Sequence, residues 1–168
     1  RMTLHEKTLQ LQNRPVGRID EIESIFQGQS YGCTHEMGKT AEECAGIYNE
    51  LQKYMLTKTR LGIPILTAVE GIQGILQNNS TLFPHSIAQG STFNPELIER
   101  MTDAAGKEAA AMGIHQVLSP VFDIARELRW GRVEETYGED PFLISEMGIG
   151  FVKGYQKHQI TCTPKHFV

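Results

Sequence analysis

The sequence predicts an α/β fold with parallel strands. Stretches with a helical spacing of apolar residues alternate with three short apolar, β-branched runs, which is the pattern of consecutive βα units. Glycine and charged residues gather directly after these runs, where folds of this kind carry their binding sites. The chain has 168 residues, of which 40% are hydrophobic and 21% charged, so it can form one ordered domain.

Four helices are predicted, each beginning at a residue whose side chain can cap a helix N-terminus. These caps are Thr3, Thr40, Asn94 and Asp140. Glutamate follows Thr3 and Thr40 at the capping-box position, and proline follows Asn94 and Asp140 at the first helical position. The expected helices cover about residues 4–11, 41–61, 95–112 and 141–158.

Three buried strands are predicted between these helices, over residues 63–69, 116–122 and 160–163. The segments that connect strands to helices are expected to be long loops, and the segment after the first helix a loop with at most short elements. These three segments are 13–39, 77–93 and 123–139. The alternating order brings the residues that follow each strand to one edge of one sheet.

Polar side chains are expected at that edge from Glu70, Arg132 and the adjacent pair Lys165 and His166. A carboxylate can accept hydrogen bonds from two vicinal hydroxyls of a sugar, while the basic side chains can donate, and Trp130 offers an aromatic face. Structural roles are equally open. Glu70 could cap the next helix, Lys165 could pair with a carboxylate, and His166 could bond to backbone. Arg132 could pair with a nearby carboxylate of Glu134, Glu135 or Glu139.

Composition and motifs exclude several classes of function. The formal charge is −4, which argues against nucleic acid or an anionic membrane as a partner and favours a neutral substrate. No apolar run approaches the ~20 residues of a membrane span. The cysteines and histidines lack metal-ligand spacing, and GxGxxG, P-loop and GxSxG motifs are absent. We therefore expect no metal and no organic cofactor.

Five motifs resemble those of family 3 glycoside hydrolases, and they occur in the family's order. Residues 130–141 read WGRVEETYGEDP and resemble the family's WGR-x-EE-x-(F/Y)-GEDP segment. Residues 60–65 resemble its RLGIP run before the first strand, and Phe83-Pro84 its T-x-FP loop. Residues 119–124 resemble its APV-x-DI strand end, and residues 165–167 its KHF. The long GEDP segment is the specific one.

The resemblance implies that residues 1–168 form the first half of an N-terminal (β/α)8 TIM-like barrel, without the rest of the barrel and the C-terminal domain. It implies a retaining β-glucosidase-like enzyme that removes terminal non-reducing β-D-glycosyl units from a neutral β-glycoside or oligosaccharide. Glu70, Arg132, Lys165 and His166 would bind the sugar. The nucleophilic aspartate and the acid/base glutamate would lie after Val168, so the chain alone is expected to be inactive.

The sequence departs from the family pattern at Glu70, because many glucosidases have Asp-x-x-His-Gly where this chain has Glu-Gly-Ile-Gln-Gly. A β-xylosidase, a β-N-acetylhexosaminidase and a non-catalytic sugar-binding remnant therefore stay open as alternatives. The open strand edges of half a barrel predict association with the rest of the enzyme or with other copies. A secreted or periplasmic location is favoured over a cytoplasmic one.

Overall fold

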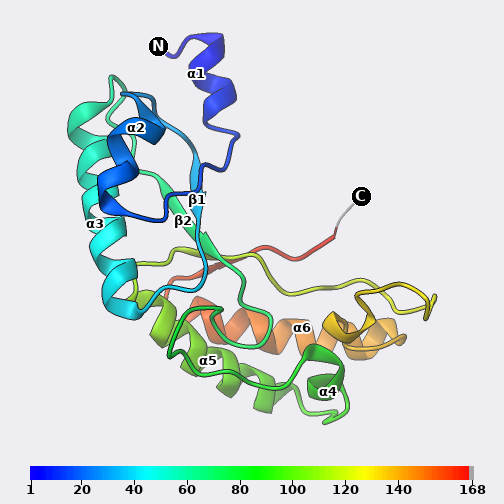
Figure 1. Cartoon of the computed structure of the whole chain (residues 1–168). Coiled ribbons are helices and arrows are strands. Elements are labelled where there is room, and N and C mark those ends of the chain that lie inside the picture. Colours follow the sequence, from blue (N-terminus) through cyan, green and yellow to red (C-terminus); the bar gives the residue numbers. More distant parts are fainter. Residues whose placement is uncertain (167–168) are drawn as a thin grey trace.

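The computed structural model describes residues 1–166 and has a four-stranded parallel sheet flanked by helices (Figure 1). The strands pair in sequence order: β1 (Cys33–His35), β2 (Leu66–Val69), β3 (Gln116–Val117) and β4 (Thr161–Cys162). The helices are α1 (Leu4–Leu9), α2 (Ile22–Phe26), α3 (Ala41–Lys58), α4 (Ser86–Gly90), α5 (Pro95–Ala111) and α6 (Pro141–Gln156). Two 3-10 turns are η1 (Ile19–Glu21) and η2 (Val133–Glu135).

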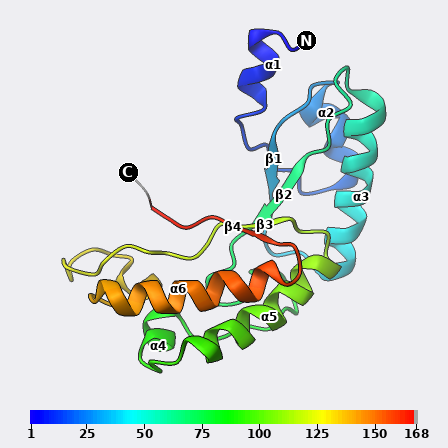
Figure 2. The same ribbon diagram turned by 180° about the vertical axis from the view of Figure 1, so that it is seen from behind.

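The α/β prediction with parallel strands is confirmed. Ala68 of β2 is in register with His35 of β1 and with Gln116 of β3, and Val117 of β3 is in register with Cys162 of β4. The chain returns through α3, α5 and α6 between consecutive strands (Figures 1 and 2). Neighbouring strands are therefore also consecutive strands, which is the connectivity of a (β/α) barrel.

The four helices whose N-caps were predicted, α1, α3, α5 and α6, begin directly after those caps. Thr3 and Thr40 each accept a hydrogen bond from the amide three residues on and complete a capping box. The side chain of Asn94 caps α5, and that of Asp140 caps α6. The predicted end of α3 at residue 61 is wrong, since the helix ends at Lys58 before an extended Thr59.

The sequence missed the first strand and several short helices. Residues 13–39 contain α2 and β1, the predicted loop 77–93 contains α4, and the predicted loop 123–139 contains η2. The strand after residue 62 is therefore the second strand and not the first. It is also shorter than predicted, because Pro64 has no amide hydrogen to donate. Gln52 of α3 bonds both backbone groups of Ile65 in place of a neighbouring strand.

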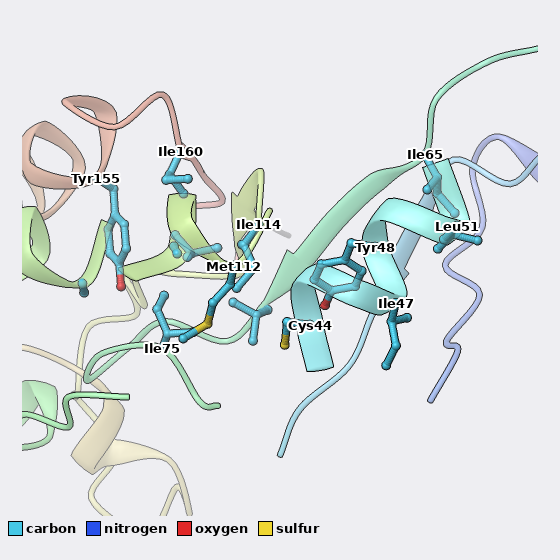
Figure 3. Packing of buried hydrophobic residues seen from close by; sticks show 14 of the residues in the cluster. Cys44, Ile47, Tyr48, Leu51, Ile65, Ile75, Met112, Ile114, Tyr155 and Ile160 are labelled. Carbon is cyan, nitrogen blue, oxygen red and sulfur yellow. The ribbon is translucent and has the colours of Figure 1, made fainter. Parts of the chain in front are cut away.

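The core lies between the sheet and its helices. Apolar side chains of α3 pack against β2 and its flank, and a second group under β3 and β4 faces α5 and α6 (Figure 3). α5 and α6 lie side by side in both overall views (Figures 1 and 2). Their close approach depends on glycine, because a β-carbon at Gly154 would lie 2.4 Å from the carbonyl oxygen of Glu99 on α5.

Candidate substrate-binding site

The predicted residues Glu70 and Lys165 meet at the carboxyl ends of β2 and β4. Lys165 Nζ donates to Glu70 Oε1 at 2.8 Å, although the two residues are 95 positions apart in the chain. The pair is well shielded, with 14% of the lysine side chain and 23% of the glutamate side chain exposed. The other carboxylate oxygen accepts a longer hydrogen bond of 3.4 Å from Ser119 Oγ. Glu70 is therefore held by partners from two neighbouring strand ends.

The predicted residues Arg132 and His166 also meet, in a row of four charged or polar groups. Arg132 donates twice to Glu135, at 2.6 and 2.5 Å, and its Nη1 lies 3.1 Å from His166 Nε2. On the other side of the ring, His166 Nδ1 lies 2.8 Å from Asp123 Oδ2. These six residues, Glu70, Asp123, Arg132, Glu135, Lys165 and His166, are called the strand-end cluster below.

Ion pairing keeps the Arg132–Glu135 pair charged. Hydrogen bonds from Arg132 lower the pKa of Glu135 below its usual value, although burial opposes this. The same bonds raise the pKa of Arg132. Both structural roles that the sequence left open for the basic residues are present, since Arg132 pairs with Glu135 and Lys165 pairs with Glu70. The backbone bond proposed for His166 is replaced by the contact with Asp123.

The pairing leaves donors free for a ligand. A guanidinium has five N–H groups and an ammonium three. Arg132 uses three donors within the cluster and Lys165 uses one. Within residues 1–166, two donors on each side chain therefore have no partner, and the carboxylates of Glu70 and Asp123 keep unused lone pairs. The cluster can donate to a ligand and accept from it at the same time.

A pocket of about 300 Å³ opens beside this cluster. Its wall includes Glu70, Arg132 and Glu135 of the cluster, together with Gln73 and His85. Within residues 1–166, the buried Oε1 of Gln73 has no hydrogen-bond partner. Trp130, the aromatic residue that the sequence suggested for stacking on a sugar, does not line this pocket.

Sequence reasoning missed Asp123, Glu135 and His85 as parts of the site. A signal for Asp123 existed, because it is a charged residue directly after a predicted strand, as Glu70 is. Glu135 was named only as a structural partner of Arg132. His85 gave no signal, since it directly precedes the short helix α4, whose position depends on the fold.

A larger cavity of about 510 Å³ is lined by α6 and by residues 122–124 after β3, and it is unsuited to a polar ligand. Its wall is mainly apolar and includes Phe122, Ile144, Ile149 and Val152, with Lys153 as its charged member. The strand-end pocket is therefore the better candidate for binding. Across residues 1–166, no helix is both long and apolar enough to cross a membrane, and no cluster of three or more potential metal ligands occurs.

A sheet of consecutive βα units with a polar pocket at its strand carboxyl ends defines a barrel-type binding domain. The family model described as "Glycosyl hydrolase family 3 N terminal domain" matches residues 3–168. The chain therefore belongs to glycoside hydrolase family 3, and its fold is the N-terminal portion of that family's TIM-like (β/α)8 barrel. Phe167, the last residue of the KHF motif, lies outside the residues that the structure describes.

Relatives in the family are beta-xylosidases and beta-glucosidases. A Beta-xylosidase of Formosa agariphila is 40% identical over 123 residues, covering 65% of this chain and 17% of the relative. A Periplasmic beta-glucosidase of Salmonella typhimurium is 30% identical over 173 residues, covering 99% and 22%. The chain thus spans about a fifth of the length of these curated relatives.

Solved structures agree with this assignment. A β-glucosidase of Erythrobacter marinus superposes with a TM-score of 0.87 at 29% identity, over 99% of this chain and 24% of the other. A beta-glucosidase of Listeria innocua in complex with isofagomine gives 0.81 at 31% identity, over 99% and 24%. A Beta-N-acetylhexosaminidase of Beutenbergia cavernae gives 0.79 over 99% and 54%, but at 19% identity this likeness concerns the fold alone.

Proposed function

We propose that the chain is the first part of the barrel domain of a retaining exo-β-glycosidase that hydrolyses terminal non-reducing β-D-glycosidic bonds. Glu70, Arg132, Lys165 and His166 bind the terminal sugar of a neutral β-glycoside or oligosaccharide. The main support is the strand-end cluster itself, in a chain that belongs to glycoside hydrolase family 3. Its donors and acceptors stand side by side at the carboxyl ends of the strands.

The chemistry of a sugar hydroxyl matches this cluster. Each hydroxyl donates one hydrogen bond and accepts up to two, so recognition needs donors and acceptors close together. Lys165 and Arg132 supply free donors, and Glu70 supplies acceptor lone pairs. The cluster is also nearly balanced in charge, with three carboxylates (Glu70, Asp123, Glu135) against two cations (Arg132, Lys165). A neutral substrate fits this balance better than a phosphorylated one.

Glu70 has the role of a binding group in this proposal and not that of a nucleophile. Its carboxylate is shared between Lys165 and Ser119, so attack on an anomeric carbon would break both contacts. Retaining hydrolysis needs a pair of carboxyl groups about 5–5.5 Å apart, separate from Glu70. We assign that pair, an aspartate nucleophile and a glutamate acid/base, to sequence beyond Val168. The outer edge of β4 would then pair with a further strand of the same barrel. On the outer edge of β1, Cys33 already bonds to Gln12 and Arg14.

A β-xylosidase is the second candidate. It is favoured by the Formosa agariphila relative, which has the higher identity of the two curated relatives described above. The longer carboxylate of Glu70 also reaches further into the pocket than an aspartate would. The Salmonella typhimurium relative is named as periplasmic, which supports a secreted or periplasmic location for this protein.

Hydrolysis of chromogenic β-D-glycosides by the full-length protein tests the proposal. We expect turnover of the β-glucoside with retention at the anomeric carbon. NMR of the first-formed sugar shows its anomeric configuration. Preferred turnover of the β-xyloside would select the second candidate, and preferred turnover of the β-N-acetylglucosaminide the hexosaminidase alternative. Binding of glucose without any turnover would support a sugar-binding remnant and contradict the proposal. The chain of residues 1–168 alone should be inactive.

A further inference from the structure

Both ring nitrogens of His166 have partners of opposite hydrogen-bonding character. Asp123 Oδ2 lies 2.8 Å from Nδ1, and Arg132 Nη1 lies 3.1 Å from Nε2. The ring is partly open to solvent, with 41% of its side chain exposed, while 27% of the Asp123 side chain is exposed. The imidazole is thus placed between a carboxylate and a guanidinium.

The two partners determine where the ring proton sits. A guanidinium nitrogen can only donate, so His166 Nε2 must present its lone pair to Arg132. An ionised carboxylate can only accept, so His166 Nδ1 must carry the proton. A doubly protonated ring would direct an N–H group at an N–H group of Arg132 over 3.1 Å. The arrangement therefore selects the neutral Nδ1–H tautomer.

Backbone pairing places Asp123 and His166 next to each other. Val121 and Lys165 form a parallel bridge just beyond the ends of β3 and β4. Phe122 N donates to Lys165 O at 2.6 Å, and Lys165 N donates to Pro120 O at 2.9 Å. Asp123 and His166 follow directly after these bonded residues. Their contact therefore depends on the sheet and does not require the two side chains to find each other.

We infer that Asp123 is a positioning residue that holds the ring proton of His166 on Nδ1. A substrate hydroxyl can then replace the direct contact between His166 and Arg132, donating to His166 Nε2 and accepting from Arg132. This inference rests on the proposed function, because it assigns the hydroxyl to the terminal sugar. With the proton on Nε2 instead, His166 and Arg132 would both donate toward one point. Such a pair could not accept the hydroxyl's own hydrogen.

Two substitutions separate the role of Asp123 in the tautomer from a role in folding. Asp123→Leu removes both acceptors, so His166 Nδ1 loses its partner. Asp123→Asn keeps one carbonyl-type acceptor and should preserve the Nδ1–H tautomer. Asp103→Asn is the matched control, because Asp103 bonds His158 at 2.6 Å between α5 and the end of α6, outside the strand-end cluster.

Ring ¹H–¹⁵N correlation spectra of the full-length protein, labelled with [¹⁵N]histidine, report the tautomer directly. His166→Gln assigns the signal. We expect Nδ1–H for His166 in the wild type, in Asp123→Asn and in Asp103→Asn, and loss of that tautomer in Asp123→Leu. Toward a β-glycoside substrate, kcat/KM should fall about 10- to 100-fold in Asp123→Leu and less than about tenfold in Asp123→Asn.

The spectra do not depend on turnover, so the inference and the proposed function can fail separately. An Nε2–H or doubly protonated His166 in the wild type would overturn the assignment of the ring proton. An unchanged tautomer in Asp123→Leu would show that Asp123 does not hold it. A changed tautomer with unchanged kcat/KM would contradict the role in substrate binding. Absence of any glycosidase activity, with the expected spectra, would refute the proposed function and leave the tautomer assignment standing.

Discussion

Two regions of the molecule use the same kinds of charged side chain for different ends. Between α5 and the end of α6, Lys157 pairs with Glu99 at 2.7 Å and with Asp103 at 3.3 Å. His158 lies 2.6 Å from Asp103. We call Glu99, Asp103, Lys157 and His158 the helix-pair cluster. Like the strand-end cluster, it combines an aspartate–histidine contact with a lysine–glutamate pair.

The two clusters differ in what lies beside them. None of the four residues of the helix-pair cluster lines the 300 Å³ pocket, whereas three of the six residues of the strand-end cluster do. The helix-pair cluster bridges two helices that already pack closely, so we assign it to stability. The strand-end cluster lies past the carboxyl ends of β2, β3 and β4, and its cations keep donors without partners in residues 1–166. Residue type alone does not separate the two roles, and position in the fold does.

The strongest test of this comparison replaces one lysine in each cluster by methionine. Among the contacts within residues 1–166, Lys165→Met leaves the shielded Glu70 carboxylate with only the long bond from Ser119. We expect kcat/KM of the full-length protein to fall about 100-fold, or about 3 kcal/mol. Lys157→Met is the control. Its kcat/KM should stay within about twofold of the wild-type value, because exposed ion pairs contribute ~1 kcal/mol or less to stability. Equal losses in both variants would remove the distinction between the clusters.

Disrupting the packing of α5 against α6 should give the next largest effect, on the free energy of unfolding. In Gly154→Ala, the new methyl would lie 2.0 Å from Thr102 Oγ1 and 2.4 Å from Glu99 O, so the helices must separate. We expect the free energy of unfolding to drop by about 1–3 kcal/mol, measured by urea titration. Gly46→Ala in α3 is the matched control, with only one side-chain atom within reach at 3.9 Å. It should gain up to about 1 kcal/mol.

Arginine geometry gives a smaller effect. Arg132→Lys keeps the charge but loses the two-pronged contact with Glu135. We expect kcat/KM to fall about tenfold, or about 1.4 kcal/mol, mainly through KM. Arg129→Lys makes the same change at an exposed pair with Glu127 and should leave the kinetics unchanged. Similar kinetics for both variants would argue that Arg132 is only a structural partner of Glu135.

The pH dependence of the helix-pair cluster is the smallest effect. Hydrogen bonds from His158, and then from Lys157, lower the pKa of Asp103. A carboxyl group whose pKa is lower in the folded state stabilises the fold above its unfolded value of about 4. That contribution is lost as the pH falls through the folded value. Urea midpoints of Asp103→Asn should therefore decrease less than those of the wild type between about pH 5 and pH 3. A parallel decrease would contradict this role.

Short elements show most clearly where sequence reasoning stopped. The capping residues Thr3, Thr40, Asn94 and Asp140 act locally, so all four helix starts were predictable. β1 has only three residues and no run of apolar side chains, and it is a strand because it pairs with β2. α4 and η2 are each only one or two helical turns long, which is too short to show a periodicity in the sequence.

The sequence by itself determined the alternation of strands and helices, the family and the four polar residues expected at the strand ends. These are local properties of spacing, capping and motif. Only the tertiary structure decided the partners of those residues: Lys165 with Glu70 and His166 with Asp123 and Arg132. The reason is physical, since residues 43 and 95 positions apart meet only when parallel strands align their carboxyl ends. No local pattern specifies that register.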